Sequence, residues 1–279
     1  MTEKLQRVLI VSRAGHPDAP ALVEEIRLWL EGRGVCALSA EHDGTDTAEV
    51  LPVEGCDLVL VLGGDGTMIA VARQVAGRAP MLGLNMGRLG FLTELSPSDW
   101  RGFLERVLAR CCRYSERLVL RYEVQRGEAV VHGGLAINDV VLNRGSLARL
   151  IRLGLEQDGE PLGSMRADGL VIATPTGSTA YSISSGGPIV HPELEVFSVT
   201  PICPFLHNFK PMVLPGSSEF TVRVEEPHSE VYLTVDGQTC FPLHKDDVVR
   251  IVRAETGLRL LEPERSAYVS RLRAKGVIE

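Results

Sequence analysis

The segment Asp57-Leu58-Val59-Leu60-Val61-Leu62-Gly63-Gly64-Asp65-Gly66-Thr67 decides how the N-terminal half of the chain folds. Residues 58–62 are apolar without alternation, which predicts a strand buried on both faces, as in a parallel sheet. The glycines after it allow a sharp turn and let backbone N–H groups come close to a ligand. A helix that begins at Thr67 would add the partial positive charge of its N-terminus, which favours phosphate.

Asp65 is the acidic residue of this glycine turn. A carboxylate at this place suits a general base, or a metal-linked group, beside a phosphoryl group. The alternative is that Asp65 only caps the helix. The turn alone supports both interpretations equally, because glycine-rich turns are common. The chain has neither G-x-x-x-x-G-K-[ST] nor G-x-G-x-x-G after a strand, so a phosphate site here is neither a P-loop nor the usual dinucleotide fingerprint.

The first hundred residues alternate predicted strands and helices. Residues 8–11 and 80–85 predict strands, and residues 22–30 predict a helix because their apolar side chains recur at helical spacing. Residues 67–76 predict a second helix. The sequence Ser96-Pro97-Ser98-Asp99 predicts the start of a third helix, with a capping hydroxyl and a proline at the first position. This alternation predicts a parallel sheet covered by helices.

The pattern changes near Cys112. From about residue 118 to residue 252 the sequence predicts short strands separated by glycine and proline turn signals, which is typical of a sandwich-like β domain. We therefore predict an α/β domain over residues 1–112, which carries the glycine turn, and an all-β, sandwich-like domain over residues 113–253. The remaining tail comprises residues 254–279.

Composition excludes several classes of protein. The 279 residues are 44% hydrophobic and 23% charged, as in a soluble globular protein. The net charge of -7, with Lys and Arg spread along the chain, disfavours nucleic-acid binding. No apolar run approaches the ~20 residues of a membrane helix, and the charged start lacks the apolar stretch of a signal peptide. The six cysteines form no C-x-x-C pair, which excludes zinc spacing and a disulfide framework. We predict a cytoplasmic protein without nucleic-acid or membrane partners.

The most specific segment is Thr174-Pro175-Thr176-Gly177-Ser178-Thr179-Ala180-Tyr181-Ser182. Its hydroxyls and backbone amides are suited to ribose and phosphate, and they add no charge. Tyr181 is suited to cover an adenine ring. The alternative is a surface loop rich in serine and threonine. The apolar residues 170–173 and 188–190 on either side favour the ligand site.

Two further polar segments interrupt apolar runs. Asn138-Asp139 lies between residues 135–137 and 140–142, and buried polar groups there need partners. Two acceptors side by side suit the vicinal hydroxyls of a ribose, whereas a turn or β-bulge is the simpler alternative. Asp236-Gly237-Gln238 predicts a hairpin turn.

These segments, in this order, resemble the NAD kinase family, and the resemblance covers most of the chain. It rests on the glycine turn at 63–67, Gly83-Leu84-Asn85 with Gly90-Phe91-Leu92-Thr93, Asn138-Asp139, the segment from Asp168 to Pro188, Thr200-Pro201-Ile202-Cys203-Pro204 ahead of Pro211-Met212-Val213-Leu214-Pro215, and Asp236-Gly237-Gln238. The run at 174–182 is the specific element, because lipid kinases also carry the glycine turn.

The resemblance implies transfer of the γ-phosphoryl group of ATP to the 2′-hydroxyl of the adenosine ribose of NAD, which gives NADP. It also implies a divalent metal, usually Mg²⁺, that accompanies ATP. The implied fold has an α/β domain and a β domain that forms most of the NAD site, with the site in the cleft between them and the C-terminal tail returning to the first domain. Members of the family form homodimers or homotetramers.

The resemblance also implies roles for individual residues. Asp65 is the expected general base, Gly66 allows close backbone approach, and Asn138 and Asp139 hold ribose hydroxyls. Further expected NAD contacts are Asp168, Thr179, Ala180, Tyr181, Ser182, Ile183, Ser184 and Gln238. Arg149 and Arg166 are candidate phosphate or substrate contacts, since guanidinium groups pair well with phosphate.

Three positions distinguish this chain from other members of the family that it resembles. A bulky basic residue at 166 resembles members restricted to ATP, whereas glycine there resembles members that also use inorganic polyphosphate. Met86 stands where an arginine is commoner before the loop Gly87-Arg88-Leu89-Gly90. Asp139 replaces a common glutamate and has a shorter reach.

Two other functions share parts of this pattern. A lipid kinase with the same glycine turn is disfavoured by the run at 174–182 and by the lack of an amphipathic membrane-facing stretch. A nonenzymatic nucleotide-sensing module is disfavoured by the presence of Asp65.

Overall fold

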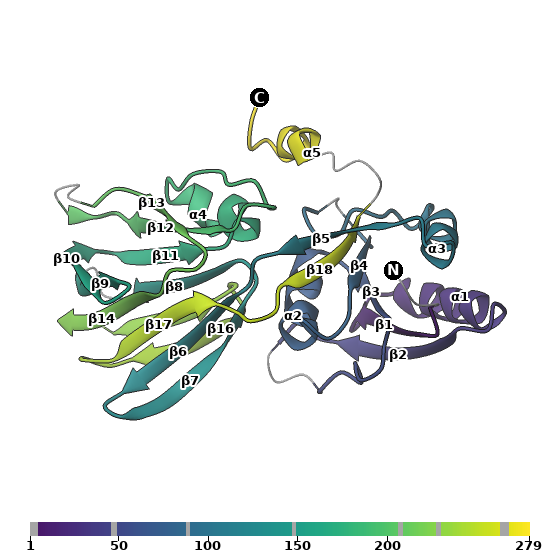
Figure 1. Cartoon of the computed structure of the whole chain (residues 1–279), viewed down its shortest axis with the longest axis horizontal. Coiled ribbons are helices and arrows are strands. Elements are labelled where there is room, and N and C mark those ends of the chain that lie inside the picture. Colours follow the sequence, from purple (N-terminus) through teal and green to yellow (C-terminus); the bar gives the residue numbers. More distant parts are fainter. Residues whose placement is uncertain are drawn as a thin grey trace. The chain divides into compact units, whose positions relative to one another are not determined.

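The computed structural model of the chain describes residues 5–45, 49–87, 90–146, 149–205, 209–226, 230–262 and 268–279. The chain divides into two compact units, which are Met1–Glu116 with Leu258–Glu279, and Arg117–Gly257 (Figure 1). Among the described residues, no helix is both long and apolar enough to span a membrane.

The first unit is built on a six-stranded sheet in the order β2-β1-β3-β4-β18-β5. Its strands are β1 (Arg7–Arg13), β2 (Cys36–His42), β3 (Leu58–Gly63), β4 (Met81–Asn85), β5 (Arg113–Arg117) and β18 (Leu258–Glu262). The β1–β2, β1–β3, β3–β4 and β18–β4 pairs are parallel. All six residues of β3 are buried, as a strand covered on both faces requires.

Four helices are described in this unit, namely α1 (Ala19–Glu31), α2 (Asp65–Val75), α3 (Trp100–Leu108) and α5 (Tyr268–Ala274). Two predicted starts were wrong. Helix α2 begins at Asp65, two residues before Thr67. Helix α3 begins at Trp100, because the Ser96 hydroxyl accepts from the Ser98 N–H in a local turn, and does not cap a helix.

The second unit consists of two antiparallel sheets packed face to face. One has the order β10-β9-β14-β17-β6-β7 and the other β13-β12-β11-β8-β15-β16. The strands of the first are β6 (Leu120–Arg126), β7 (Ala129–Ala136), β9 (Ile151–Gln157), β10 (Glu160–Ala167), β14 (Phe220–Glu226) and β17 (Val248–Arg253). Those of the second are β8 (Asp139–Arg144), β11 (Gly169–Ala173), β12 (Val196–Ile202), β13 (Met212–Pro215), β15 (Val231–Val235) and β16 (Thr239–Leu243).

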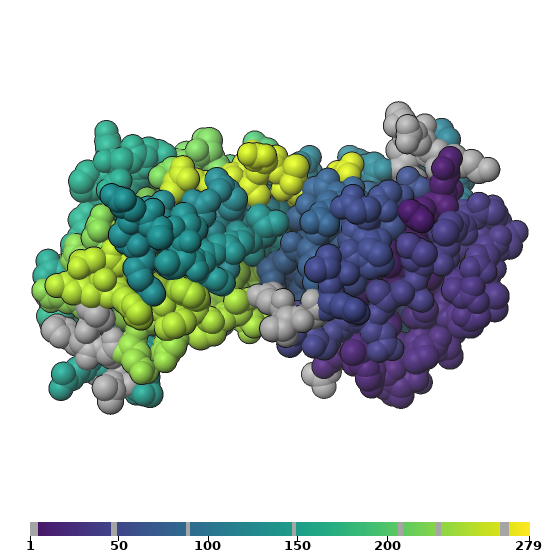
Figure 2. Space-filling view, turned by 90° about the horizontal axis from the view of Figure 1, so that it is seen from below, coloured from purple at the N-terminus to yellow at the C-terminus, as the bar shows by residue number. Residues whose placement is uncertain are grey.

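One large core joins these two sheets. It contains Leu142 and Ile172 of one sheet and Leu153 and Ile251 of the other, all fully buried. In the space-filling view, teal residues of the β6–β7 region lie beside yellow-green residues from the last strands of the same unit (Figure 2). The predicted fold class, an α/β unit followed by a sandwich-like β unit, is confirmed.

Candidate functional site

Asp65 is the first residue of α2, directly after β3 and the glycine turn. Its carboxylate does not bond to its own helix in the described contacts but to the loop that follows β4. Oδ1 accepts from the N–H groups of Leu92 (3.0 Å) and Thr93 (3.2 Å) and from the Thr93 hydroxyl (3.1 Å). Among the described residues, the one hydrogen bond that Oδ2 accepts comes from the N–H of Phe91 (2.7 Å). Since each carboxylate oxygen has two lone-pair sites, Oδ2 is the oxygen with acceptor capacity left.

The loop at residues 90–93 is itself firmly tied to β4. The Asn85 amide donates to the backbone carbonyl (3.3 Å) and to the hydroxyl (3.1 Å) of Thr93. Gly90 lies so close to Asp65 that a Cβ at this position would overlap the carboxylate, which explains a glycine here. Arg88 and Leu89, part of the predicted phosphate loop, lie outside the described residues.

The second unit carries a hollow of about 310 Å³ on the outer face of the sheet that contains β8. Strand side chains alternate between faces, so Val140 and Leu142 enter the core while Asp139, Val141 and Asn143 face outwards. The lining residues are Asn138, Asp139, Val141, Asn143, Ala180, Tyr181, Thr234, Asp236 and Gly237. Four of the predicted site residues, Asn138, Asp139, Ala180 and Tyr181, therefore meet in one hollow.

Asp236 organises one end of this hollow. It and Gly237 both have positive φ angles, 52° and 65°, in the three-residue loop 236–238 that joins β15 to β16. The Asp236 carboxylate accepts from the N–H groups of Ile137 (3.1 Å), Asn138 (2.7 Å) and Asp139 (3.1 Å). The hairpin turn predicted at 236–238 is thus also the support that holds the start of β8.

Asp139 is 3% exposed and faces the hollow. Burial, together with repulsion from Asp236, raises the pKa of the Asp139 carboxyl from 3.8 to about 7, although a hydrogen bond from the backbone N–H of Tyr181 opposes the shift. Two neighbouring carboxyl groups with such different surroundings are characteristic of functional sites. Near neutral pH the Asp139 carboxyl can both donate and accept a hydrogen bond, which suits a sugar hydroxyl.

The hydroxyl-rich run forms a short 3₁₀ turn (Thr176–Thr179) and a single helical turn, α4 (Tyr181–Ser184). Several of its hydroxyls are structural. Thr174 donates to the carbonyl of Ile137 (2.7 Å), and Ser178 donates to the carbonyl of Pro175 (2.7 Å). The hydroxyl of Ser182 is buried against that of Thr200 (3.4 Å). Tyr181, by contrast, is 47% exposed at the rim of the hollow.

The other predicted residues do not line the hollow. Asp168 lies at the opposite end of β8 from Asp139, where it pairs with Arg144 (2.5 Å). Arg166 is exposed on the edge strand β10, with its guanidinium 5.7 Å from the ring centre of Phe205. Thr179, Ser182, Ile183 and Ser184 flank Tyr181, Gln238 is the last residue of the hairpin turn, and Arg149 precedes β9. Gly66 is exposed in the first turn of α2.

Sequence reasoning missed five lining residues, namely Val141, Asn143, Thr234, Asp236 and Gly237. Counting in twos from Asp139 along the predicted strand would have found Val141 and Asn143. Thr234 is different, because it reaches the hollow only through the pairing of β15 with β8, where it stands opposite Val141.

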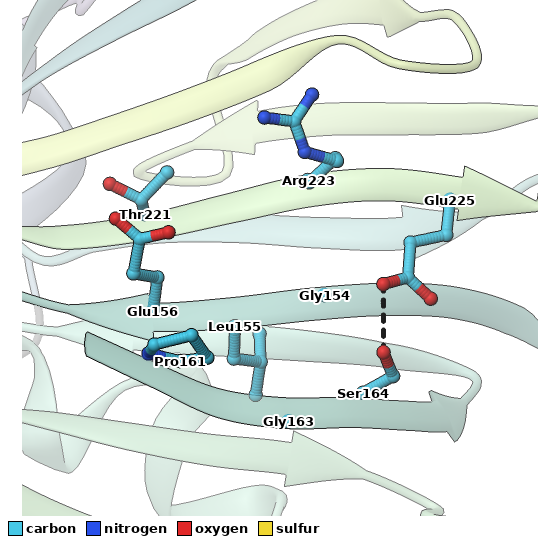
Figure 3. A pocket seen from close by; sticks show the side chains of 9 residues that line it. All are labelled: Gly154, Leu155, Glu156, Pro161, Gly163, Ser164, Thr221, Arg223 and Glu225. Atoms are coloured by element: carbon cyan, nitrogen blue, oxygen red, sulfur yellow. Dashed lines mark hydrogen bonds between the residues drawn. The ribbon is translucent and has the colours of Figure 1, made fainter. Parts of the chain in front are cut away.

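A second hollow of about 200 Å³ lies on the outer face of the other sheet (Figure 3). Its wall includes Glu156, Thr221 and Arg223, and the Ser164 hydroxyl donates to Glu225 (2.7 Å). Gly154 and Gly163 form its floor in place of side chains. No predicted site residue lines it.

Gly177 packs tightly against the backbone of Asn138. A Cβ at this position would overlap the backbone carbonyl of Asn138, which cannot move away because it also accepts from the N–H of Thr174 (2.8 Å). We expect Gly177→Ala to lower the free energy of unfolding by about 1–3 kcal/mol. Thermal unfolding measures this. Gly102→Ala is the control, because α3 has open space there, and alanine should raise stability by up to about 1 kcal/mol. An unchanged unfolding temperature for Gly177→Ala would contradict the prediction.

Comparison with known proteins identifies the family. Two family models match: the ATP-NAD kinase N-terminal domain over residues 38–111 and the ATP-NAD kinase C-terminal domain over residues 137–262. The chain is 47% identical over 281 residues to the NAD kinase of Oleidesulfovibrio alaskensis, covering 100% of this chain and 95% of that protein. It is 47% identical over 280 residues to the NAD kinase of Nitratidesulfovibrio vulgaris strain Miyazaki F, covering 100% and 99%. The chain belongs to the NAD kinase family.

Solved structures of NAD kinases and NADH kinases share its fold. A yeast NADH kinase complexed with NADH superimposes with a TM-score of 0.86 at 26% identity, covering 98% of this chain and 87% of the yeast chain. An NAD kinase from Archaeoglobus fulgidus in complex with ATP gives a TM-score of 0.74 at 25% identity, covering 93% and 94%. The protein is therefore an enzyme with NAD kinase activity, which phosphorylates NAD to NADP with ATP, and the predicted function is confirmed.

Proposed function

We propose that the adenosine end of NAD binds in the hollow on β8, with the ribose at Asn138 and Asp139 and the adenine against Tyr181. The observation that carries this is the meeting of three distant segments, residues 138–143, 180–181 and 234–237, in one hollow. The hollow combines the half-exposed ring of Tyr181, which is suited to stack on a base, with the carboxyl groups of Asp139 and Asp236, which are suited to bond to ribose hydroxyls.

The order of the polar groups along β8 indicates how the dinucleotide is oriented. Asp139 stands at one end of β8, whereas Asn143 and the Asp168–Arg144 pair stand at the other, about 15 Å away along the strand. We propose that the dinucleotide extends along this strand, so that Asp168 contacts the part of NAD distant from the adenine. Arg149, Arg166 and Gln238 stay predicted contacts with weaker support, because none of them lines the hollow.

We propose that Asp65 is the general base. The 2′-hydroxyl oxygen of the adenosine ribose attacks the γ-phosphorus of ATP, its proton passes to the carboxylate, and ADP leaves with the electrons of the broken P–O bond. The support is geometric: three N–H groups and one hydroxyl orient the carboxylate, and Oδ2 keeps acceptor capacity for the proton. Phosphoryl transfer depends mainly on positioning, so the orientation of Asp65 matters as much as its basicity.

We further propose that a divalent metal, most simply Mg²⁺, arrives with ATP. Among the described residues, no three His, Cys, Asp or Glu side chains gather as a metal cage. The proposed metal would therefore be held mainly by the phosphates of ATP and by water, which is how Mg²⁺ usually accompanies nucleotides. The metal would neutralise charge on the phosphates.

Three other expectations remain proposals. A homodimer or homotetramer is supported by the family resemblance alone. A cytoplasmic location is supported by the six cysteines, which form no disulfide and all lie in the described residues. Restriction to ATP as donor is supported by the basic side chain of Arg166 two residues before Asp168.

An NADP-formation assay tests these proposals. The purified protein is incubated with NAD and Mg²⁺, and with either ATP or inorganic polyphosphate. NADP from ATP alone supports the donor restriction. NADP from both donors removes the inference from Arg166 and leaves the kinase activity unaffected. Replacing NAD by NADH in a parallel reaction shows whether the reduced dinucleotide is also an acceptor.

Tyr181 is the residue whose exposure points most directly to the dinucleotide. We expect Tyr181→Ala to weaken NAD binding by about tenfold, since stacking on a base contributes roughly 1–3 kcal/mol. The unfolding temperature should change little, because the ring is half exposed. Calorimetric titration with NAD measures the affinity, and Tyr181→Phe, which keeps the ring, is the control. An unchanged affinity in Tyr181→Ala would exclude stacking.

A further inference from the structure

The C-terminal helix α5 places a buried cation next to the loop that holds Asp65. Tyr268, Arg271 and Leu272 are its buried residues, and the spacing i, i+3, i+4 puts them on one face. The Arg271 side chain is only 6% exposed. A buried arginine requires charged or polar partners, because an isolated charge is costly away from water.

Arg271 forms an ion pair with Glu94, whose side chain is 16% exposed. Glu94 directly follows Thr93, the residue that gives Asp65 both its N–H and its hydroxyl. The Asn85 amide donates to the Thr93 hydroxyl, and Arg271 pairs with the next residue, Glu94. The Asp65 carboxylate therefore rests on a loop that is fastened at its end by the C-terminal helix.

The charges of these residues also link Arg271 to Asp65. Asp65 accepts hydrogen bonds from the loop, Glu94 directly follows Thr93 of that loop, and Arg271 is a cation close to both acids. Burial lowers the pKa of Arg271, and attraction to Asp65 opposes part of that shift. Without Arg271, Glu94 would have little solvent and no ion pair with another described residue, and the loop would have to move to hydrate it.

We propose that Arg271 is a positioning residue for Asp65, acting through its ion pair with Glu94 on the loop at residues 91–94. This inference rests on the proposed role of Asp65. It gives the C-terminal helix an indirect part in catalysis, through the loop that holds Asp65.

The test begins with steady-state kinetics and NAD titration of Arg271→Ala. We expect kcat to fall by about tenfold or more, because a small displacement of a reacting group is costly. The NAD dissociation constant should stay within about twofold of the wild type, since NAD binding is proposed in the other unit. Arg273→Ala is the matched control: Arg273 lies on the same helix, is exposed, and donates only to the carbonyl of Glu279 (3.4 Å) among its described hydrogen bonds.

Two further variants separate positioning from folding. Arg271→Lys keeps a cation for Glu94 and should recover part of kcat. The double variant Arg271→Ala/Glu94→Gln removes both charges and should exceed Arg271→Ala in kcat, because no unpaired carboxylate remains buried. If neither variant exceeds Arg271→Ala in kcat, and all three unfold at a lower temperature, Arg271 has a merely structural role and the proposal fails.

The decisive measurement uses the Asp65→Asn background. If Arg271 acts through Asp65, Arg271→Ala should lower kcat there by no more than about twofold, because coupled residues are not additive. An equal loss in both backgrounds overturns the proposal. Wild-type kcat in Asp65→Asn itself would instead remove the proposed base, so the failures of the two proposals are distinguishable. A kcat within about twofold of wild type in Arg271→Ala also overturns the positioning role.

Discussion

Asp65→Asn is expected to lower kcat for NADP formation by about 10²–10⁴, the range that a general base contributes. Asparagine cannot take the proton of the 2′-hydroxyl. Its amide also has a donor where Oδ2 accepts from the N–H of Phe91 (2.7 Å), so two donors would face each other and the loop would shift. Both effects reduce turnover. NAD titration and steady-state kinetics, run in parallel, measure the variant.

A second variant separates the two effects. Thr93→Val removes only the hydroxyl that donates to Oδ1 (3.1 Å) and leaves the base in place. We expect its kcat to fall far less than that of Asp65→Asn, by about tenfold, the lower end of what one hydrogen bond to a charged group contributes. If Asp65→Asn kept wild-type turnover, Asp65 would have no part in the chemistry. If the two variants lost equal turnover, Asp65 would orient the substrate rather than accept its proton.

Asp139→Asn is expected to stabilise the protein at alkaline pH. The pKa of the Asp139 carboxyl is raised from 3.8 to about 7 in the folded state, so the folded protein keeps a proton that the unfolded chain has already lost. The free energy of unfolding therefore falls as the pH rises above the unfolded value, and this loss is complete above about pH 7. Asparagine is uncharged and still accepts from the N–H of Tyr181. Its advantage over aspartate should grow by about 2 kcal/mol between pH 5 and pH 8.

Chemical denaturation at pH 5 and pH 8 measures this difference. Asp247→Asn is the control with the opposite sign. Burial acts to raise the pKa of Asp247, but hydrogen bonds from Arg126 and from the N–H of His244 outweigh it, so the pKa is lowered. That carboxylate therefore stabilises the fold above its ordinary pKa, and asparagine there should destabilise at both pH values. A pH-independent effect of Asp139→Asn would contradict the raised pKa.

The lower free energy of unfolding that the Asp139 carboxyl causes at high pH is consistent with its proposed role in NAD binding. A buried acid beside a second carboxyl is an expensive arrangement for a core, and binding sites are where such arrangements persist. We expect Asp139→Asn to combine the gain in stability with weaker NAD binding, because asparagine cannot exchange donor and acceptor roles with a ribose hydroxyl as a carboxyl group does.

Local pattern was sufficient for much of the fold. The uninterrupted apolar run at 58–62 predicted a strand covered on both faces, and these residues form most of β3. The Asp236-Gly237 pair predicted a hairpin because both positions need positive φ, and both have it. The start of α3 was predicted one turn too early, since the Ser96 hydroxyl found a partner in its own turn.

The amino-acid sequence by itself determined the family and the two kinds of architecture, because turns, strand periodicity and motifs depend on neighbouring residues. Only the tertiary structure decided which polar groups form hydrogen bonds or ion pairs with one another. Pairing of β8 with β15 brings Thr234 to the hollow, and the hairpin at Asp236 fastens the start of β8. Folding of the C-terminal helix places Arg271 beside Glu94, 177 positions away in the chain (271 minus 94). Such contacts arise from packing and desolvation between segments distant in sequence, which no local pattern encodes.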